Sequence, residues 1–95
     1  MLSYKEKGIK MDKKQKMLIT LAKRLKTLRN NNNLSQQELG NKINISGTMI
    51  GYIETAKKPP SIYTLKRISY YFNVTTDYLL GLSDENKYKK EKNIL

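Results

Sequence analysis

The chain has 95 residues, enough for one domain, and it contains neither Cys nor His. The lack of Cys excludes disulfides, thiol catalysis and cysteine-based metal sites, and the lack of His removes the commonest general base and metal ligand. No apolar run approaches the length of a membrane span, and the N-terminus lacks the apolar core of a signal peptide. We therefore expect a cytoplasmic protein with no membrane association, no cofactor and no enzymatic activity.

The chain is strongly basic, with 19 Lys and Arg against 8 acidic residues and a net charge of +11. The excess persists in residues 17–82, which hold nine basic and three acidic residues. A basic globular region favours a polyanionic partner. Compositional bias is an alternative explanation, because the chain is rich in Lys, Asn, Ile and Tyr, as an AT-rich genome would encode. Charge alone does not decide between them.

The first predicted element is a long helix over residues 13–31. Asp12 followed by Gln15 has the spacing of a capping box, in which two side chains satisfy free amides at a helix start. The helix then carries one apolar stripe, formed by Leu18, Leu21, Leu25 and Leu28. Residues 1–11 precede it without any core pattern and are expected to form a flexible basic arm.

Residues 34–54 have the pattern of two short helices. Ser35 followed by Glu38 forms a second capping box, and Ser46 is a suitable first cap for the next helix. The apolar positions share one inner face in each helix; they are Leu39 and Ile43 in the first and Ile50 and Ile53 in the second.

A tight turn separates these two helices. Asn44 tolerates the left-handed backbone conformation that such a turn needs. Gly40 falls where the two helices cross, a place where a larger side chain would hold them apart. Residues 35–54 therefore have the layout of a helix-turn-helix, whose second helix can enter the major groove of DNA.

Two further helices follow a loop at residues 57–60. Ser61 is expected to cap a helix whose core face consists of Ile62, Leu65, Ile68 and Phe72. Thr75 is expected to cap a short last helix that carries Tyr78, Leu79 and Leu80 and ends at Gly81. The predicted fold is all-α, a compact five-helix bundle over residues 12–82, followed by a polar tail over residues 83–95.

At this point the chain resembles the Cro/C1-type helix-turn-helix proteins, the family of lambdoid phage repressors and many small bacterial regulators. The resemblance covers roughly two thirds of the chain and rests on LAKRLKTLRNNNNLSQQEL, ISGTMIGYIE and KKPPSIYTLKRISYYFNVTTDYLLG in that order. The chain departs from the family pattern in two places. Asn44 stands where the family usually has Gly, and Gly47 and Gly51 lie in the part of the second helix expected to be exposed.

The motif predicts which residues contact DNA bases. Outward residues near the start of the second helix meet base edges in this geometry, and here they are Ser46, Gly47, Thr48 and Tyr52. No Arg, Asn or Gln lies on this face, so direct readout is expected to be sparse and DNA shape to contribute to specificity. Alternatively, Tyr52 is an ordinary half-buried surface tyrosine. Met49 is expected to pack within the protein rather than to contact a base.

The resemblance also implies phosphate contacts and an internal ion pair. Gln36 matches a position that commonly binds backbone phosphate in the family, and Lys42, Lys57 and Lys58 are further candidates, although Lys42 could equally be a solvated surface residue. Arg29 and Glu54 match a pair that forms an internal ion pair in the family, for which the planar guanidinium is well suited.

These observations predict a sequence-specific regulator of transcription that binds double-stranded DNA, with repression as the expected direction. It would bind a palindromic operator as a homodimer, through a surface around Tyr70, Tyr78, Leu79 and Leu82 unless those residues complete the core. We expect no ligand or cleavage domain in a chain of this length, and therefore expect control by concentration or by a regulatory protein partner.

Three alternatives stay open. The same fold serves as the antitoxin of a toxin–antitoxin pair or as the controller of a restriction system. The protein could also be an interaction module that no longer recognises DNA. The two glycines, Gly47 and Gly51, and the lack of polar base-contacting side chains in the second helix would support this alternative. Residues 1–11 could be an arm that contacts DNA, a solvated extension, or an artefact if translation begins at Met11.

Overall fold

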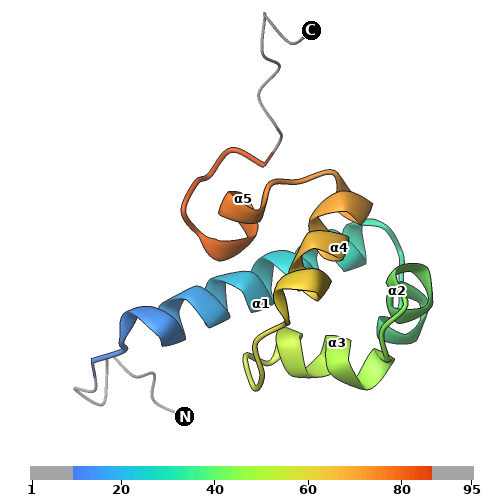
Figure 1. Ribbon diagram of the computed structural model, residues 1–95, viewed down its shortest axis with the longest axis horizontal. Coiled ribbons are helices and arrows are strands. Elements are labelled where there is room, and N and C mark those ends of the chain that lie inside the picture. The colour runs from blue at the N-terminus through green and yellow to red at the C-terminus, as the bar shows by residue number, and fades with distance from the viewer. Residues whose placement is uncertain (1–9, 87–95) are drawn as a thin grey trace, which may run out of the picture.

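The computed structural model describes residues 10–86, and this part of the chain forms five α-helices and no strand (Figure 1). The helices are α1 (Lys13–Asn31), α2 (Gln36–Ile43), α3 (Gly47–Glu54), α4 (Ile62–Phe72) and α5 (Thr76–Leu80). The predicted all-α fold with five helices is confirmed. Most of the predicted arm, residues 1–9, and of the predicted tail, residues 87–95, lie outside the described residues.

Local capping sets the helix boundaries. At the start of α1, the Gln15 amide donates to the Asp12 carboxylate at 2.7 Å, and the Asp12 amide donates to the Gln15 side chain at 3.2 Å. Each later helix also begins at a hydroxyl that accepts an amide hydrogen bond, as the sequence predicts. The C-caps of α4 and α5 take the left-handed conformation; they are Asn73 and Gly81.

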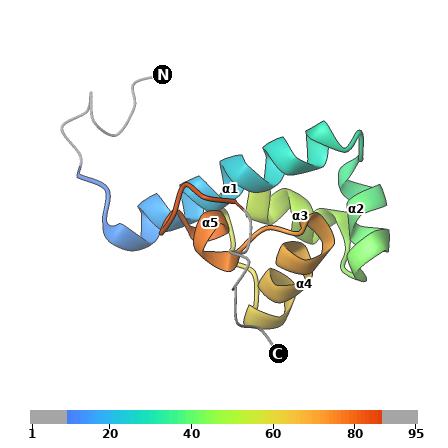
Figure 2. The same cartoon turned by 90° about the horizontal axis from the view of Figure 1, so that it is seen from above.

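One apolar core joins all the helices. α1 packs against α3 and α5, α2 packs against α3 and α4, and α4 packs against α5. The first turns of α1 extend beyond the other helices in both views (Figures 1 and 2). The buried apolar side chains are Leu21, Ala22, Leu25, Leu39, Ile43, Ile50, Ile53, Ile68, Val74 and Leu79.

The predicted core face of α4 is wrong at one residue. Ile68 is fully buried, and Leu65 and Phe72 pack against the core, but Ile62 is 89% exposed. At 100° per residue, Ile62 lies about 90° from the mean direction of the other three side chains. It therefore sits at the margin of the apolar stripe, in the first turn of the helix.

The predicted dimer surface also needs correction. Leu79 is fully buried and belongs to the core, and Tyr78 packs against that core. Tyr70 and Leu82 are 71% and 73% exposed. Of the four residues, only these last two are freely available to a partner chain.

The described part of the predicted tail is held against the bundle. The Arg24 guanidinium donates to the backbone carbonyls of Tyr78 and Ser83, forms an ion pair with Asp84 at 3.0 Å, and lies over the Tyr78 ring. The Thr75 amide donates to the Asn86 carbonyl at 3.2 Å. Residues 83–86 thus pack with α1 and α5. Among the described helices, none has the length and apolarity to cross a membrane.

Candidate nucleic-acid interface

The α2–turn–α3 segment has the backbone geometry that its sequence predicts. The Glu38 amide donates to the Ser35 hydroxyl at 3.0 Å, and the Ser35 amide donates to the Glu38 carboxylate at 2.9 Å. These hydrogen bonds with Ser35 lower the pKa of Glu38, because they stabilise its charged form. Asn44 adopts the left-handed conformation with a φ of 60°, and the Met49 amide donates to the Ser46 hydroxyl at 3.0 Å. The turn therefore sets the direction of α3 relative to α2.

Two glycines of α3 face α2 rather than solvent. Gly47 is buried, and a Cβ there would lie 3.1 Å from the Gln37 Cα. A Cβ on Gly51 would lie 3.3 Å from the Gln36 side-chain oxygen. The expectation that these glycines lie in the exposed part of the helix is wrong for Gly47, and Gly51 is only partly exposed. Gly47 allows the backbone of α2 to approach α3 closely, and Gly51 leaves room for the Gln36 side chain.

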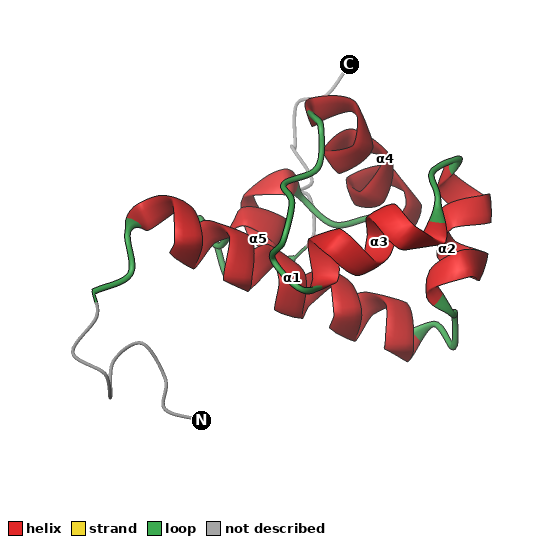
Figure 3. Ribbon diagram, turned by 90° about the horizontal axis from the view of Figure 1, so that it is seen from below, coloured by secondary structure: helices red, strands yellow, loops and turns green. Residues whose placement is uncertain are grey.

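The outer side of α3 presents a small set of polar groups. Seen from below, α3 lies in front of the other helices, beside α2 (Figure 3). Ser46 and Thr48 are exposed and Tyr52 is half-buried, whereas Met49 packs against the core. Of the four residues predicted to contact bases, Gly47 alone is buried, so any contact from it would involve only its backbone.

Lys57 and Lys58 gather at the end of α3, around Tyr52. Their amides both donate to the Tyr52 carbonyl, at 2.8 and 3.3 Å. Their ammonium nitrogens lie 5.4 and 4.7 Å from the centroid of the Tyr52 ring. The structure thus brings a predicted base-contacting residue and two predicted phosphate contacts together in one cationic cluster.

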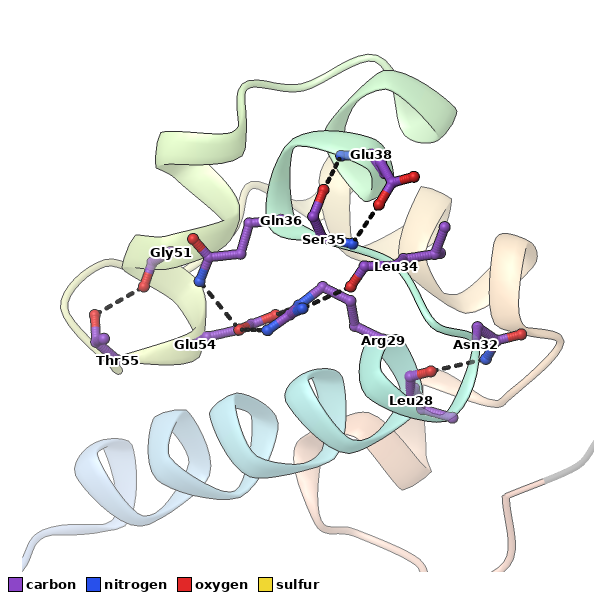
Figure 4. Close-up of polar contacts among 10 residues, drawn as sticks. All are labelled: Leu28, Arg29, Asn32, Leu34, Ser35, Gln36, Glu38, Gly51, Glu54 and Thr55. Carbon is purple, nitrogen blue, oxygen red and sulfur yellow. Dashed lines mark hydrogen bonds and ion pairs between the residues drawn. The ribbon is translucent and has the colours of Figure 1, made fainter.

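Gln36 lies at the start of α2 and reaches toward the end of α3 (Figure 4). Its side-chain amide donates to Glu54 at 3.2 Å, and its carbonyl oxygen faces Gly51. Glu54 therefore positions the side chain of Gln36, the predicted phosphate contact. The first amides of α2 lie at the same helix end, where backbone donors and the helix dipole favour an anion.

Glu54 is itself held by Arg29. The Arg29 Nε and Nη2 donate to the two carboxylate oxygens at 2.6 and 2.8 Å, and Nη1 donates to the Leu34 carbonyl at 2.7 Å (Figure 4). The side chains of Arg29 and Glu54 are only 10% and 2% exposed. The hydrogen bond to Glu54 raises the pKa of Arg29 above its already high ordinary value. Arg29 thus lies inside the domain, where it fixes Glu54 and, through it, Gln36.

Lys42 lies apart from this group. It is six residues beyond Gln36 along α2, about 9 Å along the helix axis. It lies near Lys66 and Arg67 of α4 and interacts electrostatically with Glu38, one turn earlier in α2. The phosphate contact predicted for Lys42 stays a prediction.

The sequence interpretation missed the roles of Arg24 and Arg67. Arg67 donates to the carbonyls of Ile43 and Asn44 at 3.1 and 3.4 Å, which satisfies the C-terminal end of α2. Composition offered one signal for these roles: only three of the 19 basic residues are Arg, and the other sixteen are Lys. Each of the three Arg side chains binds more than one oxygen within the fold. A guanidinium offers five N–H donors in a fixed planar fork, whereas an ammonium is a compact charge with three.

The bundle, the left-handed turn and the exposed start of α3 define a helix-turn-helix protein. A helix-turn-helix family model matches residues 25–79, which is more than half of the chain. The chain belongs to the Cro/C1-type helix-turn-helix family. No solved structure matches the chain.

Several curated proteins are similar to the chain. It is 38% identical over 77 residues to the HTH-type transcriptional regulator ImmR of Bacillus subtilis (strain 168), covering 81% of this chain and 60% of ImmR. It is 33% identical over 69 residues to the uncharacterized HTH-type transcriptional regulator YobD of the same organism, covering 73% of this chain and 62% of YobD. It is 40% identical over 58 residues to the HTH-type transcriptional activator BcrR of Enterococcus faecalis, covering 61% of this chain and 28% of BcrR. The chain thus spans less than two thirds of each relative.

Proposed function

We propose that this protein is a transcription regulator that binds double-stranded DNA in a sequence-specific manner and acts as a repressor at its operator. The observation that carries the proposal is the cluster at the outer side of α3. Thr48 and Tyr52 are accessible there, Lys57 and Lys58 surround Tyr52, and Gln36 lies at the adjacent helix start. Family membership and the names of the relatives, all of which are transcriptional regulators, support DNA binding. Such a protein works in the cytoplasm, at the nucleoid.

In this proposal α3 enters the major groove of DNA, and the groups around it bind the phosphate backbone of the DNA. Thr48 offers a hydroxyl to a base edge and its methyl group to thymine, while Tyr52 donates to a base or phosphate. Ser46 uses its hydroxyl oxygen to cap α3 and keeps its proton for donation. Lys57, Lys58 and the start of α2 contact the flanking phosphates, with Gln36 positioned by Glu54.

A single domain of this kind covers one half-site, so we propose a homodimer on a palindromic operator with half-sites about 34 Å apart. Leu82 is the exposed apolar residue beside the buried end of α5 and is the candidate for the interface. The alternative of an interaction module that has lost DNA reading loses one of its supports. Gly47 and Gly51 are explained by the packing of α2 residues against α3 rather than by a loss of DNA-contacting side chains.

Replacing Tyr52 tests the assigned reading surface. We expect Tyr52→Ala to weaken binding to the operator by roughly tenfold to a hundredfold, since one good base contact is worth about 1–3 kcal/mol. Affinity for unrelated duplex should change little. The measurement is fluorescence anisotropy with both duplexes at one salt concentration.

Tyr52→Phe is the matched control, because it keeps the ring beside the two lysines and removes only the hydroxyl. A loss shared by both variants assigns the effect to hydrogen bonding, and a loss confined to the Ala variant assigns it to the ring. If both variants bind the operator as the wild type does, Tyr52 is a surface residue that only packs against Lys57 and Lys58.

A further inference from the structure

A second surface feature lies away from the cluster around Tyr52. An open groove of about 500 Å³ runs between the C-terminal end of α2 and the outer face of α4. We call it the α2–α4 groove; its charged and aromatic lining residues are Lys42, Tyr63, Lys66, Arg67, Tyr70 and Tyr71. None of the DNA contacts proposed on α3 or in the loop after it lines this groove.

The groove combines exposed aromatic rings with an excess of positive charge. Tyr63, Tyr70 and Tyr71 are 64%, 71% and 39% exposed, which is unusual for three neighbouring aromatic side chains. The groove is lined by three basic residues and no acidic one. Within residues 10–86, no ion pair involves Lys42 or Lys66.

The floor of the groove is fixed in place. The Arg67 guanidinium is bound to the end of α2 by two carbonyls, and its central carbon lies 4.4 Å from the centroid of the Tyr63 ring. The Lys66 ammonium lies 5.5 Å from the centroid of the Tyr70 ring, one helical turn further on. The two cations therefore lie between Tyr63 and Tyr70 along α4, each over one of the rings, and Arg67 also binds the end of α2.

From this arrangement we infer that the α2–α4 groove docks an acidic peptide segment of a partner protein, one that alternates carboxylates with aromatic or aliphatic side chains. Carboxylates would pair with Lys66 and Lys42, and apolar side chains would pack on the exposed rings, which are the residue types that dominate binding energy at interfaces. The groove is open along its length, which suits an extended chain better than an enclosed small molecule.

A second copy of this protein fits the groove less well. The chain carries a net charge of +11, so two copies would bring like charges together at a surface that already lacks acidic residues. A docked peptide would leave the start of α3 free. The partner could then act on the protein while it is bound to DNA, which goes beyond the proposed function.

The test uses the full chain and a short fluorescein-labelled peptide in which Glu alternates with Phe and Leu. The groove variant is Lys66→Ala with Tyr70→Ala, both exposed positions, and Lys42 is left intact because it is also a predicted phosphate contact. The matched control is Lys26→Ala with Ile62→Ala, which likewise removes one exposed cation and one exposed apolar side chain, neither of which lines the groove. Anisotropy gives the peptide affinity, and light scattering gives the oligomeric state.

We expect the groove variant to bind the peptide at least tenfold more weakly than the wild type and the control, with operator affinity unchanged within about twofold. The same peptide with Gln in place of Glu should bind poorly to every variant. Equal binding of the acidic peptide to all three proteins, or none, would overturn the inference. So would a groove variant that loses operator affinity, which would make the groove a DNA surface, or one that loses its dimer, which would make it a contact between copies.

Discussion

Arg29→Ala is expected to lower the melting temperature by roughly 10–25 °C and to weaken DNA binding only as a consequence of the lost stability. The substitution removes both hydrogen bonds to Glu54 and the one to the Leu34 carbonyl. It leaves the Glu54 carboxylate, only 2% exposed, without its cation. Breaking a buried pair in this way costs about 3 kcal/mol, and each kcal/mol corresponds to roughly 4–8 °C in a domain of this size. Thermal denaturation followed by circular dichroism measures the change.

Two further variants separate the pair from its surroundings. Lys26→Ala removes an exposed cation from the same helix and is expected to change stability by less than about 0.5 kcal/mol. Replacing both partners by apolar residues, Arg29→Met with Glu54→Leu, should recover most of the lost stability, because no buried charge is then left unpaired. If Arg29→Ala melts like the wild type yet binds DNA poorly, then Arg29 contacts DNA and its internal role is wrong.

The second large effect is expected for Gly40→Ala. A Cβ at this position would overlap the Ile45 carbonyl oxygen and would lie 3.1 Å from the Gly47 nitrogen. All of these neighbours are backbone atoms of the turn, so relief requires moving α3 relative to α2. Overpacking of this kind typically costs about 1–3 kcal/mol. We expect lower stability in urea denaturation and weaker operator binding even under conditions where the variant is folded.

Gly51→Ala provides the matched control for this substitution. It makes the same chemical change inside a neighbouring helix, but the nearest atoms belong to the flexible side chain of Gln36, at 3.3 Å and beyond. The Gln36 side chain can shift, and Ala gains about 1 kcal/mol of helix propensity over Gly. Gly51→Ala should therefore be neutral or stabilising. If the two variants have equal stability, the helix crossing at Gly40 is not the tight contact described here.

Features controlled by neighbouring residues could be predicted from the sequence. The capping pair of Asp12 with Gln15 and that of Ser35 with Glu38 depend on side chains three residues apart, so spacing alone locates both helix starts. The left-handed turn at Asn44 likewise follows from one residue type.

Features controlled by distant segments were predicted less well. Ile62 and Leu79 both belong to apolar helical patterns, yet one is 89% exposed and the other fully buried. Which apolar side chain is covered depends on how α4 and α5 pack against the remaining helices, and periodicity within a helix does not contain that information. The contacts of Arg67 with the end of α2 span more than twenty residues and left no local pattern.

The site shows the same division. The resemblance pairs Arg29 with Glu54, but it does not reveal that Glu54 also holds Gln36. The Gln36 side chain lies against Gly51 when it makes this contact. Gly47 is the glycine that allows the backbones of α2 and α3 to approach closely beside the surface that we propose contacts DNA.

The most direct test of the central claim is the preference for one DNA sequence. Fluorescence anisotropy at several salt concentrations would compare duplex from upstream of the gene encoding this protein with a scrambled duplex of equal length and composition. We expect about a thousandfold or greater preference for the upstream DNA, together with a salt slope that rises by about 0.9 for each phosphate neutralised. Equal and steeply salt-dependent binding to both duplexes would contradict sequence-specific regulation and would leave only a basic surface that meets phosphate.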